Sequence, residues 1–193
     1  MAERIELKHA PRSAKEGRMD DVEWLPAPLT ASRVRVRRPQ HGDEAALVAL
    51  FTDEDVRQFV GGPLGTDDAQ RRAARIVADG SWGDFVVEIL AERAVIGSGD
   101  LRRKRGPWEI SYQFDRAYWG LGLASEMLTA LVSWFFAATD ENLLIAVTQD
   151  ANRRSAQLLE RAGGRSSGTF QQYGAVQRRY EFRRGSVSCG GDA

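Results

Sequence analysis

Two glycines, Gly120 and Gly122, stand one residue apart in the segment DRAYWGLGLASEM, after an alternating stretch and before a long apolar helix pattern. The first turn of an α-helix leaves four backbone N–H groups without intrahelical partners and carries the positive end of the helix dipole. Glycine allows a bulky anion to approach these groups closely. The segment therefore predicts a phosphate-binding turn, and the surrounding chain must indicate which phosphate compound it holds.

Two familiar phosphate-binding motifs match this turn incompletely. A dinucleotide fingerprint would have a third glycine where Ser125 stands, although Glu141 lies about where a ribose-binding acid is expected. The preceding strand pattern places Glu109, Ser111 and Gln113 on one side, whereas an inner strand of a dinucleotide-binding sheet is apolar throughout. A P-loop would need Gly-Lys-Ser/Thr, which does not follow. A nicotinamide-dinucleotide oxidoreductase remains a less favoured alternative.

Hydrophobic periodicity predicts a mixed α/β order around the turn. Strand patterns occupy residues 33–38, 84–90, 94–103, 108–114, 143–149, 168–173 and 176–182. Helical patterns occupy residues 42–53, 56–60, 66–79, 121–137 and 152–163. This order predicts a mixed, mostly antiparallel sheet of about seven strands with helices on both faces.

The chain is expected to form one domain at residues 31–184. Residues 1–30 have mixed charge, three prolines and no sustained periodicity, so we expect a mobile N-terminal tail. Met19 begins MDDVEWLPAP and is a candidate translation start, which mass spectrometry of the native N-terminus would test. Residues 185–193 are expected to form a disordered C-terminal tail.

Composition excludes several classes of function. Lys plus Arg and Asp plus Glu number 27 each, and a formal net charge of zero argues against bulk affinity for nucleic acid or anionic membranes. The single cysteine, Cys189, excludes a disulfide framework or a cysteine-based metal site. The two histidines, His9 and His41, both lie well before the glycine turn and its neighbouring strands, and His41 is expected in a turn before the helix N-cap Asp43. We expect no metal, and the lack of an apolar membrane span or signal peptide predicts a cytoplasmic protein.

Four segments, in order and at natural spacing, resemble the GNAT acetyltransferase superfamily and within it the Rim-type branch of ribosomal-protein N-terminal acetyltransferases. The segments are SRVRVRRPQHGDEAALVALFTDEDVRQFVGGP, AVIGSGDL, YQFDRAYWGLGLASEML and TQDANRRSAQLLERAGG. The resemblance covers residues 31–184. It implies a GNAT-like fold, acetyl-CoA as the acetyl donor, and transfer of the acetyl group to a primary amine by direct attack on the thioester.

The resemblance also implies how acetyl-CoA is bound. The turn would hold the pyrophosphate through the backbone of Tyr118, Trp119, Gly120, Leu121, Gly122 and Leu123. The strand ending at Phe114 would splay from the strand at 143–149, so that the pantetheine arm pairs with its exposed edge. The backbone N–H near Tyr112 or Gln113 would polarise the thioester carbonyl. Asn152, at the family's Asn-Xaa-Xaa-Ser spacing, would contact the pantetheine arm, cap its helix, or do both.

Two residues are candidate catalysts. Ser155 would hydrogen-bond or protonate the departing thiolate, unless it merely faces solvent; the tyrosine that many superfamily members use as general acid is replaced by Leu159. Glu109 would take a proton from the amine, unless it is simply a surface carboxylate. The superfamily's Gln or Arg before the glycines is replaced by Ala117.

The expected partner is an amine acceptor, either a small molecule or a protein N-terminus, with no direct nucleic acid and no membrane. The protein would be a monomer or a homodimer. A non-catalytic CoA-binding sensor or partner module remains the alternative from another functional class.

Overall fold

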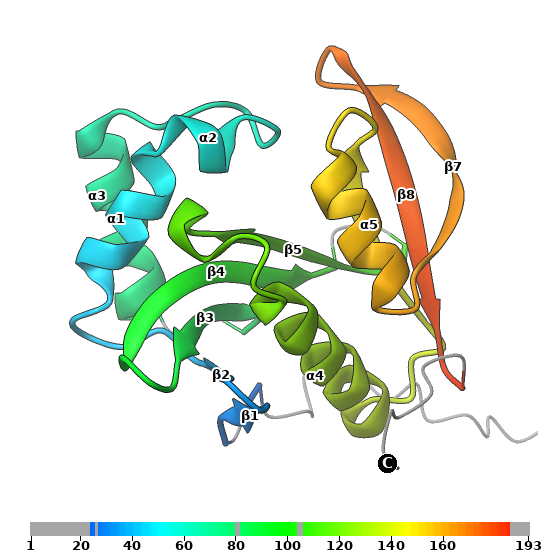
Figure 1. Cartoon of the computed structure of the whole chain (residues 1–193), viewed down its shortest axis with the longest axis horizontal. Helices are drawn as coiled ribbons and strands as arrows, with labels where there is room; N and C mark the ends of the chain where they lie inside the picture. The colour runs from blue at the N-terminus through cyan, green and yellow to red at the C-terminus, as the bar shows by residue number, and fades with distance from the viewer. Residues whose placement is uncertain (1–23, 26, 80–81, 104–105, 186–193) are drawn as a thin grey trace, which may run out of the picture.

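The computed structural model describes residues 24–25, 27–79, 82–103 and 106–185, and these form a single sheet flanked by helices (Figure 1). The strands are β1 (Leu29–Thr30), β2 (Val34–Arg37), β3 (Asp84–Ile89), β4 (Ala94–Arg102), β5 (Trp108–Phe114), β6 (Leu143–Gln149), β7 (Arg165–Gln172) and β8 (Ala175–Arg183). Their order in the sheet is β1-β2-β3-β4-β5-β6-β8-β7. Of the described strand pairs, β5 with β6 is parallel and the others are antiparallel. The predicted mixed, mostly antiparallel sheet is confirmed, with the two-residue β1 as an additional strand.

Helices lie on both faces of this sheet, as predicted. They are α1 (Glu44–Thr52), α2 (Glu54–Arg57), α3 (Thr66–Asp79), the 3₁₀ turn η2 (Arg116–Tyr118), α4 (Leu123–Ala138) and α5 (Arg153–Arg161). Strand β3 is buried on both sides: Val86 packs with α1 and α3, whereas Phe85 and Val87 belong to the larger core that includes α4. Successive residues of a strand point to opposite faces, so one apolar strand serves both cores.

Two residues of the expected N-terminal tail, Trp24 and Leu25, pack in the core of the domain. Trp24 is 1% exposed and Leu25 is 4% exposed, and both belong to the main core. The Trp24 ring lies 4.9 Å from that of Trp82 and 5.1 Å from that of Trp134, and its Nε1 donates to Asp84 O at 2.8 Å. Two isolated apolar residues have no periodicity that would predict burial. Residues 1–23, with Met19, and most of the expected C-terminal tail lie outside the described residues.

Asp43 occupies the predicted N-cap position of α1, but its side chain does not cap the helix. Its carboxylate instead accepts hydrogen bonds from the Arg37 guanidinium at 2.7 and 2.9 Å and from the Gln40 N–H at 2.8 Å. A buried guanidinium needs such a partner, and it competes successfully for the carboxylate. Because of this pairing, Asp43 joins α1 to β2.

In the described part of the chain, no helix is long and apolar enough to cross a bilayer. The same part contains no group of three or more acidic, histidine or cysteine side chains placed to hold a metal ion.

Candidate active site

The central feature of the sheet is a gap between β5 and β6. These strands pair at Trp108 with Leu144 and at Glu109 with Ile145, and then diverge. Beyond this point β5 remains paired with β4, and β6 remains paired with β8. The expected divergence is therefore confirmed, and no strand among the described residues pairs with this edge of β5 beyond Glu109.

Backbone direction distinguishes the two expected carbonyl-polarising residues. Asp115 N–H donates to Ile96 O on β4 at 2.8 Å. Alternate residues of a strand direct their N–H and C=O groups to the same neighbour. The backbone of Gln113 therefore faces β4, whereas the N–H of Tyr112 faces the gap. The Gln113 side chain also turns toward β4 and donates to Ser98 Oγ at 3.1 Å.

The turn that follows β5 is anchored by its own aromatic side chains. Trp119 Nε1 donates to Phe114 O at 2.8 Å, and the Arg154 guanidinium lies 4.7 Å from the centre of the Trp119 ring. The Tyr118 hydroxyl donates to Glu92 Oε2 at 2.7 Å. Arg154 and Glu92 were not predicted, because no local pattern records contacts between distant segments. These anchors hold the turn while its backbone stays exposed.

Gly120 and Gly122 adopt the left-handed conformation, with φ of 78° and 79°. Other residue types adopt this region only at a cost. A Cβ at Gly120 would meet no atom within 4 Å, and Gly122 is the N-cap of α4. Helix α4 begins at Leu123, which is buried, while Leu121 is exposed. The predicted helix start at residue 121 is two residues early, since Gly122 leaves the helical region.

This turn fits a phosphate group. Its glycines are exposed and carry no side chain, and the first N–H groups of α4 have no intrahelical acceptors. The turn follows directly from β5, so the gap and the exposed helix end lie along one continuous segment, residues 110–122 (Figure 1).

Ser155 does not merely face solvent. Asn152 Oδ1 accepts the Ser155 N–H at 3.2 Å and caps α5, as predicted. Ser155 Oγ lies 3.1 Å from the Tyr112 hydroxyl, so a hydrogen bond joins α5 to β5. Burial raises the pKa of the Tyr112 phenol to about 12, although the bond to Ser155 opposes the rise. Tyr112 is therefore a neutral hydrogen-bonding group at ordinary pH. Leu159 is buried in the core.

Glu109 lies at the closed end of the gap, between Arg102 of β4 and Ile145 of β6. By the alternation of β5, it shares a face with Ser111 and Gln113. Tyr112, which contacts Ser155, points to the other face. The structure thus places the two candidate catalysts on opposite faces of β5 rather than side by side. Phe114 is 6% exposed, and its ring belongs to the core.

The segment containing α2 borders the open end of the gap. Gln149 Nε2, at the end of β6, donates to Phe59 O at 3.2 Å. Arg116, after β5, forms an ion pair with Asp55 of α2. Both sides of the gap therefore contact the same segment, which forms one wall on the face that carries Glu109.

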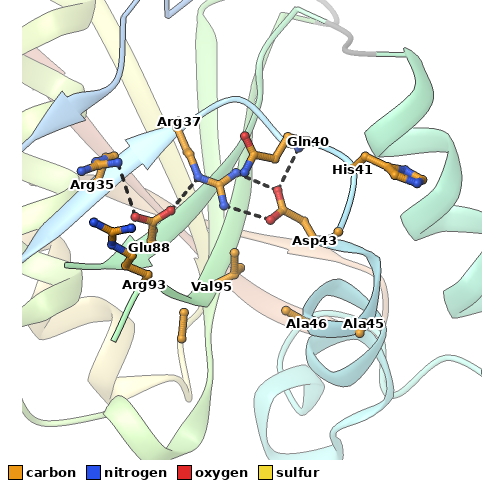
Figure 2. Close-up of a pocket in the computed structure, with 12 residues that line it drawn as sticks. Arg35, Arg37, Gln40, His41, Asp43, Ala45, Ala46, Glu88, Arg93 and Val95 are labelled. Carbon is orange, nitrogen blue, oxygen red and sulfur yellow. Dashed lines mark hydrogen bonds and ion pairs between the residues drawn. The ribbon is translucent and has the colours of Figure 1, made fainter. Parts of the chain in front are cut away.

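A separate surface cavity of about 740 Å³ lies over β2 and the start of α1 (Figure 2). Its ion pairs are structural: Arg37 bonds Asp43 and also Glu88 at 2.9 Å, and the bond to Asp43 contributes most to raising the pKa of Arg37. Strands β3 and β4 separate β2 from the gap. This cavity is therefore distinct from the candidate active site.

Comparison with known proteins agrees with this geometry. The family described as "Acetyltransferase (GNAT) domain" matches residues 33–165, which is more than half of the chain. An uncharacterized N-acetyltransferase, p20, of Bacillus licheniformis is 25% identical over 153 residues, covering 75% of this chain and 86% of that protein.

Solved structures of acetyltransferases share the fold. A GNAT family acetyltransferase from Bacillus anthracis has a TM-score of 0.73 at 22% identity, over 81% of this chain and 98% of that one. Ribosomal-protein-S5-alanine acetyltransferase from Vibrio fischeri has a TM-score of 0.67 at 17% identity, over 83% of this chain and 98% of that one. The aminoglycoside acetyltransferase AAC(6′)-Ib, solved with paromomycin and acetyl-CoA, has a TM-score of 0.69 at 16% identity, over 84% of this chain and 100% of that one. The family match over most of the domain shows that this chain belongs to the GNAT family of acetyltransferases.

Proposed function

We propose that this enzyme transfers the acetyl group of acetyl-CoA to a primary amine by direct attack on the thioester. The observation that carries this proposal is the continuity of residues 110–122, which join an unpaired strand edge to an exposed helix N-terminus. Acetyl-CoA has matching chemistry along its length, with a thioester, an amide-rich arm and a pyrophosphate. The AAC(6′)-Ib structure with acetyl-CoA supports this choice of donor.

In this proposal the donor is bound mainly by backbone groups. Residues 118–123 surround the pyrophosphate, with Gly120 and Gly122 allowing close approach. The gap-facing edge of β5, at Tyr112 and at the N–H of Phe114, pairs with the pantetheine amides, and Asn152 adds a side-chain amide. The N–H of Tyr112 faces the gap and is the proposed donor to the thioester oxygen. The backbone of Gln113 faces β4 instead, so Gln113 acts by holding β5 in place beside the donor.

The opposite positions of Glu109 and Ser155 suit direct transfer. The ammonium form of an acceptor on the Glu109 face loses a proton to that carboxylate, and the neutral nitrogen then bonds the acetyl carbon and releases its second proton to solvent. The carbon–sulfur bond then breaks, with the sulfur leaving toward the other face. There the Ser155 hydroxyl donates a hydrogen bond to the thiolate, while Tyr112 orients that hydroxyl. Base and thiolate stabiliser would be far from each other and would not exchange protons.

Two acceptor classes remain in this proposal, a small-molecule amine and a protein N-terminus. Structural neighbours include an aminoglycoside acetyltransferase and a ribosomal-protein-S5-alanine acetyltransferase. Both classes present an amine nitrogen as the nucleophile, and Glu109 would accept its proton in either case.

The donor assignment is tested by ligand-induced stabilisation. Acetyl-CoA at one hundred times its dissociation constant should raise the free energy of unfolding by about 2.7 kcal/mol, because it binds the native state. NAD should leave the midpoint of thermal unfolding unchanged. A shift with NAD and none with acetyl-CoA would contradict the assignment and favour an oxidoreductase.

Release of free CoA thiol in the presence of an amine panel, with mass spectrometry of the products, would distinguish an enzyme from a CoA-binding module.

Gly122→Val is expected to abolish measurable acetyl-CoA binding while the domain remains folded. The branched side chain would lie at the helix end where the pyrophosphate is proposed to bind, and its Cβ would lie 3.3 Å from Arg33 Nη2. The matched control is Gly174→Val, since Gly174 has φ of 74° and open space around it. Both variants should lose about 1–3 kcal/mol of stability through backbone strain. Calorimetric titration should find acetyl-CoA affinity lost in the first variant alone; equal affinities would place the phosphate elsewhere.

A further inference from the structure

Arg33 brings a positive charge to the phosphate-binding turn from a distant part of the chain. It precedes β2, and its side chain is 51% exposed. Its Nη2 lies 3.3 Å from where a Cβ on Gly122 would be, so the guanidinium lies beside the N-cap of α4. The alternating pattern of 33–38 predicted a strand there and gave no reason to place Arg33 at this turn.

Arg33 is held in place by Glu126, in the first turn of α4. Arg33 Nε donates to Glu126 Oε1 at 2.6 Å, Arg33 Nη2 lies 2.5 Å from the same oxygen, and the Arg33 N–H donates to Oε2 at 2.9 Å. In the part of the chain that the structure describes, Arg33 Nη1 makes no hydrogen bond. One edge of the guanidinium is thus used by Glu126, and the other remains available.

The charge of Glu126 explains why this pairing matters for a bound phosphate. An acidic residue in the first turn of a helix interacts favourably with the helix dipole. The same carboxylate would repel a phosphate placed at that helix end. Arg33 neutralises the carboxylate and still has donors left, and a guanidinium matches phosphate oxygens in geometry and charge.

We propose that Arg33 makes the enzyme select acetyl donors that carry the CoA phosphates, by neutralising Glu126 and donating its free guanidinium edge to the pyrophosphate. This inference rests on the proposed function. Loss of Arg33 leaves Glu126 uncompensated beside the phosphate, so it should weaken binding of acetyl-CoA. A thioester without phosphates meets neither charge, and its binding should not change.

The test compares two donors, acetyl-CoA and S-acetylpantetheine, which keeps the thioester and amide arm but lacks phosphate. In calorimetric titrations, Arg33→Gln should raise the dissociation constant of acetyl-CoA by about 10- to 100-fold, as expected for a charge-assisted hydrogen bond. Its dissociation constant for S-acetylpantetheine, measured in the same way, should stay within about twofold of the wild-type value. Arg33→Gln/Glu126→Gln should recover part of the acetyl-CoA affinity. Arg35→Gln is the matched control, because Arg35 lies two residues further along the chain and pairs with Glu88 at 3.5 Å. This variant should leave the affinities for both donors unchanged.

Several results would overturn the inference. An equal loss for both donors would show that Arg33 only ties β2 to α4, and unchanged acetyl-CoA affinity in Arg33→Gln would exclude the contact. If Arg33→Gln does not fold, Arg33→Lys provides the test. Lysine keeps the positive charge but lacks the paired N–H donors of the guanidinium, so it should weaken acetyl-CoA binding several-fold without affecting the binding of S-acetylpantetheine. Wild-type protein that fails to bind acetyl-CoA would refute the proposed function itself, which separates that failure from failure of the role of Arg33.

Discussion

Glu109→Gln is expected to lower kcat by about 10²–10⁴-fold at neutral pH, the usual contribution of a general base. Glutamine has nearly the same shape but cannot accept the proton that the ammonium form of the acceptor must lose before its nitrogen attacks. The loss should shrink as pH rises, because more of the acceptor amine is then neutral without help. Measurement of kcat from about pH 6 to 10 in wild type and variant tests this expectation.

Ser155→Ala provides the contrasting profile. A hydrogen bond to the leaving sulfur does not depend on the protonation of the amine, and the Tyr112 phenol stays neutral over this range because its pKa is about 12. The loss in Ser155→Ala should therefore be similar at every pH, with little change in acetyl-CoA affinity. Parallel profiles for wild type and Glu109→Gln would remove Glu109 from the mechanism, and an unaffected Ser155→Ala would remove Ser155.

The pH at which the Glu109→Gln and wild-type rates converge should follow the pKa of the acceptor amine used in the assay. An α-amino group titrates near pH 8, whereas a lysine-like alkylamine titrates near pH 10.4. With an acceptor that carries an α-amino group the two rates should therefore converge by about pH 9, whereas with an alkylamine acceptor a difference should persist at that pH. A convergence pH that does not follow the acceptor would contradict the role of Glu109 as the base.

Trp24→Ala is expected to reduce the free energy of unfolding by about 3–5 kcal/mol, the usual cost of truncating a buried aromatic residue. Trp24 is 1% exposed and packs against Trp82 and Trp134. Truncation would leave a cavity there and would also deprive Asp84 O of the indole N–H that it accepts at 2.8 Å. Denaturant unfolding, followed by circular dichroism, would measure the change.

Tyr173→Ala is the control for this stability measurement. Tyr173 is also a large aromatic residue but is 86% exposed, so its truncation should change stability by no more than about 0.5 kcal/mol. Similar small effects in both variants would show that the segment before β1 does not contribute to the folded core.

Local sequence determined the elements that form the candidate site. The predicted strands at 108–114 and 143–149 coincide with β5 and β6, because alternation and apolar runs are properties of consecutive residues. The paired glycines predicted an exposed helix start, since their backbone freedom is intrinsic to the residue type. Asn152 as a helix cap was predicted for the same reason: its partner, Ser155, is three residues away.

Tertiary structure decided which distant side chains meet at those elements. Tyr112 and Ser155 are 43 residues apart, Trp24 and Asp84 are 60 apart, and Arg33 and Glu126 are 93 apart. The carboxylate of Asp43 was assigned to its own helix but instead pairs with Arg37 on β2. A local pattern shows which face of an element is apolar, but not which segment will pack there. The partners of single aromatic, hydroxyl and charged side chains depend on strand order and helix placement, which are set when the whole core assembles.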